Sequence, residues 1–302
     1  MKIQPEQHTN SYYAATTETS TDYPKLKGHQ NTDICIVGAG FSGISTGLHL
    51  SELGYKVILV EANKVGWGAS GRNGGEIIGG FSGDELMAKK YATKHRDLIW
   101  KMRWEGNDII RNKVQQYSIN CDLKWGYLDV AIKKKHLDMM QSWSEDMRSH
   151  DYPHEVNLFS KEKTANLIGT NKYIGSLLNM GNGHIHPLNL CIGEARAAES
   201  LGASIYEQSP VIKIEKSTKP TVFTEHGSIS ANALLLAGNA YHHFDKKMRN
   251  FIIPVNSFVI VTEPLSDEVI QKINPRDLAV CDPNYILEYF RLTGDKRLLF
   301  GS

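Results

Sequence analysis

The 302-residue sequence has few cysteines, no paired cysteine motif and almost no net charge. Its four cysteines are Cys35, Cys121, Cys191 and Cys281, which lie far apart. This spacing excludes the CxxC motifs of zinc and redox sites, and it favours reduced, buried thiols in a reducing compartment. We therefore expect no disulfide bonds.

Long hydrophobic runs are also missing. The longest ones, such as Ala233 to Ala237, are far too short to cross a bilayer, and the N-terminus lacks the apolar core of a signal peptide. Lysine and arginine (34) balance aspartate and glutamate (33), so no basic surface is implied. We expect a cytoplasmic protein with neither a membrane nor a nucleic acid as partner.

The stretch from Asp33 to Glu61 predicts a nucleotide-binding βαβ unit. An apolar strand over residues 34–37 runs directly into a turn with three glycines, and a helix follows. Gly38 permits the tight turn, Gly40 lets the backbone approach a pyrophosphate, and Gly43 lets the helix pack near the strand. The N-terminus of the helix then offers free N–H groups and a positive dipole end to phosphates.

A second strand, over residues 56–60, delivers Glu61 about twenty residues beyond the glycines, where a carboxylate accepts hydrogen bonds from ribose hydroxyls. An acid at this position repels the 2′-phosphate of NADP. Ala39, Ser42 and Ala62 flank these positions and complete the first set of candidate cofactor-binding residues. A chance cluster of glycines is the alternative, which the two strands, the helix and the acid together disfavour.

A second glycine-rich loop follows at residues 66–75. Such a loop lets main-chain N–H groups and one cation approach an anion or a flat ring without obstruction by side chains. Its candidate cofactor-binding residues are Ser70, Arg72, Asn73 and Gly74. An ordinary flexible loop remains the alternative. Because the loop follows directly on a dinucleotide-type unit, it favours FAD as the cofactor.

The sequence resembles the D-amino-acid-oxidase-like (DAO) superfamily of FAD-dependent amine oxidoreductases. The resemblance rests on the two glycine segments and Glu61, with Ser11-Tyr12-Tyr13 upstream and residues 183–187 downstream. The resemblance runs over most of the chain. It implies an α/β fold, with a Rossmann-like FAD-binding domain interleaved with a substrate domain of the α+β type built on an antiparallel sheet. It also implies that the main chain near Val211 lies against the adenine. One departure is Glu76, where relatives usually carry glutamine.

The expected domain organisation alternates along the chain. We expect an N-terminal surface arm over residues 1–32, the FAD-binding domain over 33–83 and 183–245, and the substrate domain over 84–182 and 246–302. Aromatic residues in the arm leave open that it packs on the body of the protein. A strand over residues 233–237 ends at Gly238, which either returns the chain to the cofactor or is a simple strand-end turn. A β-meander is expected between residues 203 and 229.

Further elements are expected in the substrate domain. Spacing predicts two surface helices over residues 84–116, a strand over 123–132, a helix over 133–150 and strands in the last fifty residues. The pair His184 and His186 does not indicate a metal site, because no third ligand has suitable spacing. We instead expect a loop over residues 181–187 that leads into a helix beginning near Pro187.

The resemblance implies the oxidation of an amine, of the γ-glutamylputrescine type, by hydride transfer to flavin. The imine then hydrolyses to aldehyde and ammonia, and molecular oxygen is the expected acceptor, yielding hydrogen peroxide. A glycine- or sarcosine-type oxidase and a flavin-incompetent remnant without activity are the alternatives. Arg291 and Tyr289 share one face of a predicted strand. If that face lines the flavin cavity, we expect Arg291 to bind a substrate carboxylate and Tyr289 to orient it; a cross-strand surface pair is the alternative. No catalytic residue and no oligomeric state follows from the sequence.

The resemblance also implies that relatives are longer than this chain at the C-terminal end. Relatives continue past the position of Ser302 through a segment that closes over the flavin. We therefore expect the strand that ends at Phe300 to lack a partner and apolar surface to be exposed. We also expect the chain alone to bind FAD weakly or not at all and to have little oxidase activity.

Overall fold

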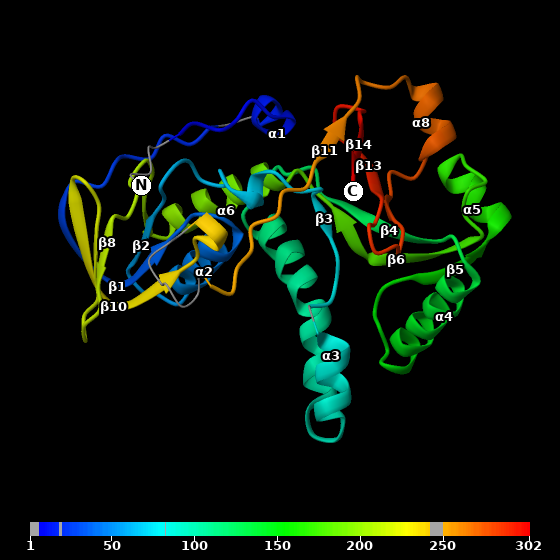
Figure 1. The fold of residues 1–302 in the computed structure, drawn as a ribbon, viewed down its shortest axis with the longest axis horizontal. Helices are drawn as coiled ribbons and strands as arrows, with labels where there is room; N and C mark the ends of the chain where they lie inside the picture. The colour runs from blue at the N-terminus through cyan, green and yellow to red at the C-terminus, as the bar shows by residue number, and fades with distance from the viewer. Residues whose placement is uncertain (1–5, 18–19, 82, 242–249) are drawn as a thin grey trace. The chain divides into compact units, whose positions relative to one another are not determined.

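The computed structural model describes residues 6–17, 20–81, 83–241 and 250–302 (Figure 1). The chain divides into two compact units. Unit 1 contains Met1–Asn73, Tyr117–Cys121 and Pro187–Asn256, and unit 2 contains Gly74–Gln116, Asp122–His186 and Ser257–Ser302. Unit 2 begins earlier than the expected boundary at residue 84, because Glu76 and Ile77 form a strand of its sheet.

Unit 1 is built on a six-stranded sheet with the order β7-β2-β1-β10-β9-β8. Its strands are β1 (Gly28–Val37), β2 (Val57–Val60), β7 (Ser204–Tyr206), β8 (Lys213–Glu215), β9 (Thr221–Phe223) and β10 (Gly227–Leu236). Its helices are α1 (Tyr12–Thr16), α2 (Phe41–Glu52), α6 (Pro187–Ser200) and the short helices η1 (Ala69–Gly71) and η2 (Asn239–Tyr241). Strands β7, β2, β1 and β10 run parallel to one another. Strands β8 and β9 form the expected antiparallel meander with β10.

The central strand β1 is longer than predicted. It pairs with β10 from Gly28 to Val37, so the last residues assigned to the arm belong to the sheet. The segment predicted as two strands, one in the meander and one over 233–237, is likewise the single strand β10. Hydrophobic side chains of these strands form the core of unit 1, namely Cys35, Val37, Ile58, Val60, Val222 and Ile229.

Helix α2 lies against the sheet next to α6 (Figure 1). A Cβ atom on Gly43 would lie 1.9 Å from the carbonyl oxygen of Gly38, so only glycine allows this approach of the helix to the turn. The predicted task of Gly43 is thus confirmed. Gly54 follows the helix with φ +84°, the left-handed conformation expected at a helix end.

The described part of the N-terminal arm packs on unit 1 through one buried carboxylate. Glu207 is fully buried and accepts hydrogen bonds from the Thr21 hydroxyl, the main-chain N–H of Tyr23 and that of Val65. The Lys64 ammonium donates to the same carboxylate at 2.9 Å and is itself nearly buried. The arm therefore has a specific, buried contact with the rest of unit 1.

Unit 2 is built on an eight-stranded sheet with the order β11-β14-β13-β12-β4-β6-β3, and β5 also pairs with β6. Its strands are β3 (Glu76–Ile77), β4 (Lys124–Ala131), β5 (Val156–Ser160), β6 (Gly175–His184), β11 (Val259–Val261), β12 (Ala279–Cys281), β13 (Tyr289–Leu292) and β14 (Leu298–Gly301). Its helices are α3 (Asp84–Gln116), α4 (Lys134–Ser149), α5 (Lys161–Ile168) and α8 (Asp267–Ile273). Most strand pairs are antiparallel, and β12 with β4 is a parallel pair.

Alternation along β4 sends side chains to two different helices. Leu128 packs in one cluster with Ile168 of α5, whereas Ala131 packs in another with Met140 of α4. Helix α3 has a kink at His95, where the two predicted surface helices meet. The predicted loop over residues 181–187 is wrong in its first part. Strand pairing of β6 with β3 and β4 extends to His184, so the loop is confined to the residues before α6.

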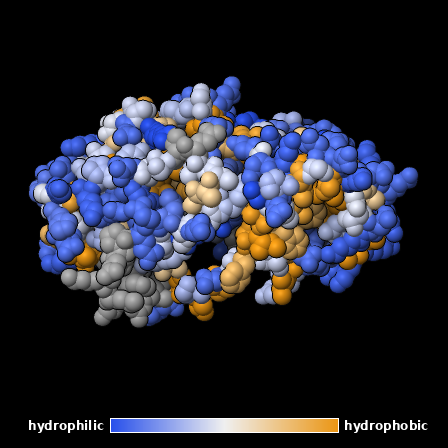
Figure 2. Space-filling view, turned by 90° about the horizontal axis from the view of Figure 1, so that it is seen from above, coloured by the Kyte–Doolittle hydropathy of each residue, from blue (hydrophilic) through white to orange (hydrophobic). Residues whose placement is uncertain are grey.

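The expectation of an unpaired last strand is also wrong. Strand β14 pairs with β13 on one side and with β11 on the other. Large hydrophobic side chains are nevertheless exposed, including Phe258 (79% exposed) and Ile260 (66%) at the edge strand β11. Figure 2 shows hydrophobic surface gathered in a contiguous area between hydrophilic areas.

All four cysteines are free and buried, as the sequence predicted. No helix in the described ranges is long and apolar enough to cross a bilayer.

The contact between Glu207 and Lys64 leads to the first testable expectation. Glu207→Gln removes the buried carboxylate partner of Lys64, whose ammonium then keeps, among the described residues, only the exposed Asp22 as an ion-pair partner, so the free energy of unfolding should fall by about 3 kcal/mol. Urea unfolding followed by circular dichroism measures this change. Glu215→Gln is the control, because Glu215 pairs with Lys213 on the surface and should matter by no more than about 0.5 kcal/mol. Equal effects of the two substitutions would contradict the structural role of Glu207.

Candidate functional site

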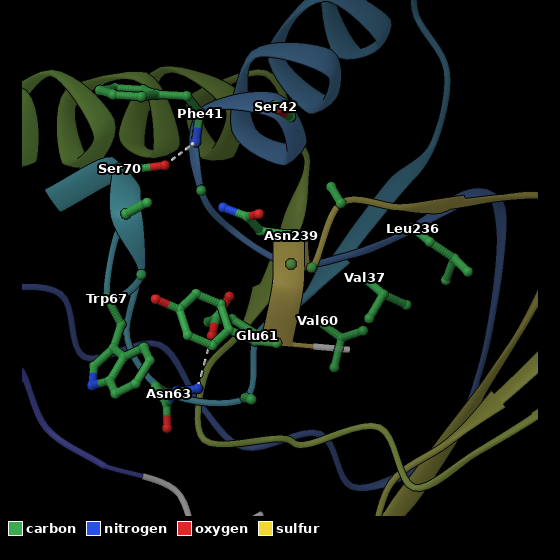
Figure 3. Close-up of a pocket in the computed structure, with 18 of the residues that line it drawn as sticks. Val37, Phe41, Ser42, Val60, Glu61, Asn63, Trp67, Ser70, Leu236 and Asn239 are labelled. Carbon is green, nitrogen blue, oxygen red and sulfur yellow. Dashed lines mark hydrogen bonds between the residues drawn. The ribbon is translucent and has the colours of Figure 1, made fainter. Parts of the chain in front are cut away.

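A cavity of about 720 Å³ lies within unit 1 at the carboxyl ends of β1, β2 and β10. It is lined by the glycine turn after β1, the residues after β2, the second glycine loop, Val211 and the residues after β10 (Figure 3). Ligands of open parallel sheets bind outside the carboxyl ends of the strands, which is the position of this cavity.

The N-terminus of α2 opens on the cavity. Gly40 caps the helix in an extended conformation, and the Phe41 N–H donates to the Ser70 hydroxyl oxygen at 2.9 Å (Figure 3). The first turn of a helix leaves N–H groups without partners in the helix, and its dipole favours an anion. Because the Ser70 oxygen accepts this bond, its own proton remains available to donate. The arrangement suits a phosphate group.

Glu61 joins the two loops that follow β1 and β2. One carboxylate oxygen accepts from the Ala39 N–H at 2.8 Å, and the other accepts from the Asn63 N–H at 2.9 Å (Figure 3). Burial raises the pKa of Glu61, and these main-chain donors oppose that rise. A carboxylate has about four lone-pair directions, so each oxygen can accept a further bond from a hydroxyl group.

The walls of the cavity differ in character. Val37, Val60 and Leu236 lie together on one side, at the ends of three neighbouring strands (Figure 3). Trp67 lies on another side, and its ring contacts Tyr241 with centroids 5.7 Å apart. Apolar and aromatic walls of this kind suit the flat rings of a nucleotide.

Arg72 provides a cation beside this wall. Its guanidinium carbon lies 4.2 Å from the centre of the Trp67 ring. Its Nη2 atom is buried and has no hydrogen-bond partner within the described residues. A buried donor without a partner is costly, so an anion or carbonyl oxygen of a ligand would stabilise it. The residues present therefore fit a flavin dinucleotide.

Most of the predicted cofactor residues come together here. Those that line the cavity are Gly38, Gly40, Ser42, Glu61, Ala62, Ser70, Val211 and Gly238. Three other candidates do not line the cavity but support the residues that do. Ala39 donates to Glu61, Gly43 packs α2 on the turn, and Asn73 donates to two carbonyl groups of its own loop. Gly74 belongs to unit 2 and is not among the residues that line this cavity.

The polar and aromatic lining residues that were not predicted include Asn63, Trp67, Asn239 and Tyr241. Asn63 and Asn239 each follow the end of a parallel strand, and that position was a usable signal. Trp67 and Tyr241 meet only because β10 brings residue 241 beside the second glycine loop. No sequence spacing indicates that contact.

The structure places Arg291 in the interior of unit 2, where it is 1% exposed. Its guanidinium donates to the carbonyl oxygens of Gly74 (2.7 Å), Ile185 (2.8 Å) and Leu292 (2.9 Å). The substrate-carboxylate role considered for Arg291 does not fit this buried environment, since Nε, Nη1 and Nη2 each already donate to a carbonyl group. Tyr289 is half-buried and packs over Gly74 and Gly301. The geometry favours structural roles for both residues.

The comparisons with known proteins agree on one family. The family model described as FAD dependent oxidoreductase (DAO) matches residues 33–302. The chain belongs to the DAO family of FAD-dependent oxidoreductases. FAD is the cofactor of this family.

Two curated DAO relatives cover nearly the whole chain. The gamma-glutamylputrescine oxidoreductase of Escherichia coli is 37% identical over 299 residues, which make up 98% of this chain and 70% of the relative. The probable oxidoreductase OrdL of Haemophilus influenzae is 37% identical over 308 residues, with the same coverage. Among solved structures, the L-proline dehydrogenase of P. horikoshii has a TM-score of 0.70 at 18% identity, covering 91% of this chain and 70% of that one. That likeness shows the DAO fold.

Glu76, where the DAO resemblance implies glutamine, has an unusual environment in unit 2. Its Oε1 atom is buried and has no hydrogen-bond partner within the described ranges. Burial, with a further contribution from the charge of Asp129, raises the pKa of Glu76 to about 8, although Arg291 and Tyr127 oppose the rise. The side chain is therefore largely neutral at pH 7. A neutral carboxylic acid has nearly the shape of glutamine and, like it, carries no charge.

The neutral state of Glu76 should make the free energy of unfolding depend on pH. An unfolded glutamate ionises near pH 4.5, whereas folded Glu76 ionises near 8, so the native state loses stability as the pH rises between these values. Glu76→Gln removes that loss. The variant and the parent should differ by less than about 1 kcal/mol at pH 5, and the variant should be more stable by about 2 kcal/mol or more at pH 9. Urea unfolding at the two pH values measures both differences.

Glu155→Gln, at an exposed position of unit 2, is the control and should show no such dependence on pH. A Glu76→Gln variant that loses stability at pH 9 would show that the ionised carboxylate is the native form.

Proposed function

We propose that the cavity of unit 1 binds FAD and that the chain oxidises a primary amine of the γ-glutamylputrescine type. The observation that carries the cofactor part is the Glu61 carboxylate, bonded to the glycine turn and to Asn63 at the ends of adjacent parallel strands. The substrate part is supported by the E. coli relative, whose name specifies gamma-glutamylputrescine and which is similar over 98% of this chain.

Each part of the dinucleotide has a matching group in the cavity. The pyrophosphate would take the N–H groups at the start of α2 beside Gly40, with a further bond from the Ser70 hydroxyl. Hydroxyl groups of the ribose would donate to Glu61. The adenine would lie on the apolar wall near Val37 and Val211. Arg72 would donate its Nη2 to an oxygen of the cofactor.

FAD supplies the acceptor for the hydride that leaves the carbon next to the amine nitrogen. The part of this chain is to hold the cofactor rigidly, which the main-chain bonds to Glu61 and the close packing at Gly43 support. The imine product would hydrolyse to an aldehyde and ammonia. Molecular oxygen is the proposed final acceptor and would yield hydrogen peroxide.

A reducing compartment is consistent with this proposal. Four free, buried cysteines occur in a chain without disulfides. We therefore place the enzyme in the cytoplasm.

The cofactor assignment is tested at Glu61. Glu61→Ala removes the acceptor of one or two charge-assisted bonds from the ribose, each worth about 1.5–3 kcal/mol, so the dissociation constant for FAD should rise at least about tenfold. Fluorescence titration of the purified chain with FAD measures this constant, and circular dichroism verifies folding. Glu225→Ala, an exposed acid of unit 1, should leave the constant unchanged. An unchanged constant in Glu61→Ala would remove Glu61 from the cofactor site.

The substrate assignment is tested with a panel of amines. γ-Glutamylputrescine should bleach the flavin absorbance of the FAD-loaded chain without oxygen, faster than free putrescine, glycine or sarcosine. Admitting oxygen should restore the absorbance and release peroxide. Faster bleaching by glycine or sarcosine would replace the proposed substrate with an amino acid. Restoration of the absorbance without peroxide would contradict oxygen as a two-electron acceptor.

A further inference from the structure

A second cavity, of about 450 Å³, lies entirely within unit 2. It is formed where α3 and α4 meet the sheet strands β4 and β6 and the loop after β3. Three of the five tryptophans of the chain line it, namely Trp100 and Trp104 from α3 and Trp143 from α4. We call it the aromatic cavity. Its volume is in the range of small-molecule sites, which is about 300–1,000 Å³.

The tryptophans are held by their neighbours. Trp100 stacks on His150 with ring centroids 4.0 Å apart and an interplanar angle of 17°, and Trp104 packs on Tyr152 at 4.6 Å. A Cβ atom on Gly79 would lie 2.1 Å from the Trp104 ring, so the loop after β3 fits directly against that indole. These contacts fix the aromatic wall before any ligand binds.

The charges in the aromatic cavity do not balance. Arg103 is its cation, and its guanidinium pairs with Asp146 at 3.2 Å and lies 5.4 Å from the Trp100 ring centre. Asp129, on β4, is the other acid of the lining. Its side chain has no hydrogen bond or ion pair in the part of the chain that the structure describes. Among the residues that the structure describes, one carboxylate therefore lines the cavity without a counter-ion.

The surroundings of Asp129 make its carboxylate unusual. Burial raises the pKa of Asp129 to about 7, and the nearby Glu76 is held largely neutral. Asp129 is only partly exposed, and a carboxylate with little access to water is costly unless a cation or donor joins it. An aromatic wall beside an unpaired carboxylate is the combination that binds organic ammonium groups, through attraction to the ring faces and to the negative charge. An anionic ligand is disfavoured, because Asp146 already neutralises Arg103.

We propose that the aromatic cavity is a binding site for an organic cation, an ammonium group on a short aliphatic chain, with Asp129 as its counter-ion. This inference rests on the proposed function only in one respect, that the natural cation is an amine substrate. Cation binding itself is independent of flavin and is measured without it.

The test uses the whole 302-residue chain and three probes of similar size, n-butylammonium, n-butanol and butyrate. Calorimetric titration should show butylammonium binding at least about tenfold more tightly than butanol, with no binding of butyrate. Asp129→Asn should weaken butylammonium binding about tenfold or more and leave butanol within about twofold. Asp138→Asn is the matched control, because Asp138 is an exposed acid on α4 outside the cavity lining.

The comparison of probes on the unaltered chain needs no variant, so the proposal remains testable if Asp129→Asn fails to fold. Equal binding of butanol and butylammonium would overturn it and leave a merely hydrophobic cavity. Tighter binding of butyrate would assign the cavity to anions through Arg103. Unchanged butylammonium binding in Asp129→Asn would remove Asp129 as the counter-ion.

A Trp143→Leu variant tests the aromatic wall. It should weaken butylammonium binding several-fold, whereas Trp143→Phe should retain most of it, because phenylalanine keeps an aromatic face. Equal loss in both variants would overturn the role of the ring. Repeating the titrations after addition of FAD separates the two proposals. A chain that binds FAD but not butylammonium contradicts only this inference. A chain that binds butylammonium but not FAD contradicts only the proposed function.

Discussion

The bond between Glu61 and the main chain of the glycine turn is the interaction on which the rest of unit 1 depends. It fixes the end of β2 to the end of β1, through the Ala39 N–H, and orders the next loop through the Asn63 N–H. The close contact of Gly43 with the Gly38 carbonyl then sets α2 against the same turn. A helix N-terminus, a carboxylate and an apolar wall consequently meet at one edge of a parallel sheet.

The sequence predicted the local arrangement of the strand, turn, helix and acid because these parts are close in the chain. A strand, a glycine turn, a helix and an acid follow one another within about thirty residues, as in other βαβ units, and their geometry depends on short-range rules. The tasks of Gly43 and Gly54 could be read from position alone. The second glycine loop was predicted as a candidate, yet its serine proved to bond the N-terminus of α2, a contact that no spacing indicates.

Unit 2 was much harder to predict, because its features depend on pairings between distant segments. Arg291 was expected at a substrate site from strand alternation, but alternation does not distinguish a surface from an interior that carries carbonyl acceptors. The aromatic cavity draws residues from two helices, two strands and a loop, so no motif marks it. Glu76 was noticed only as a departure from glutamine. Its raised pKa follows from burial near Asp129, which only the fold brings about.

The central claim is that FAD lies at the carboxyl ends of β1, β2 and β10, with Glu61 on its ribose. A crystal structure of the chain with FAD tests this most directly. The account expects ribose hydroxyls within hydrogen-bonding distance of the Glu61 carboxylate and the pyrophosphate at the start of α2 beside Gly40. A dinucleotide bound elsewhere, or one whose ribose makes no contact with Glu61, would contradict it.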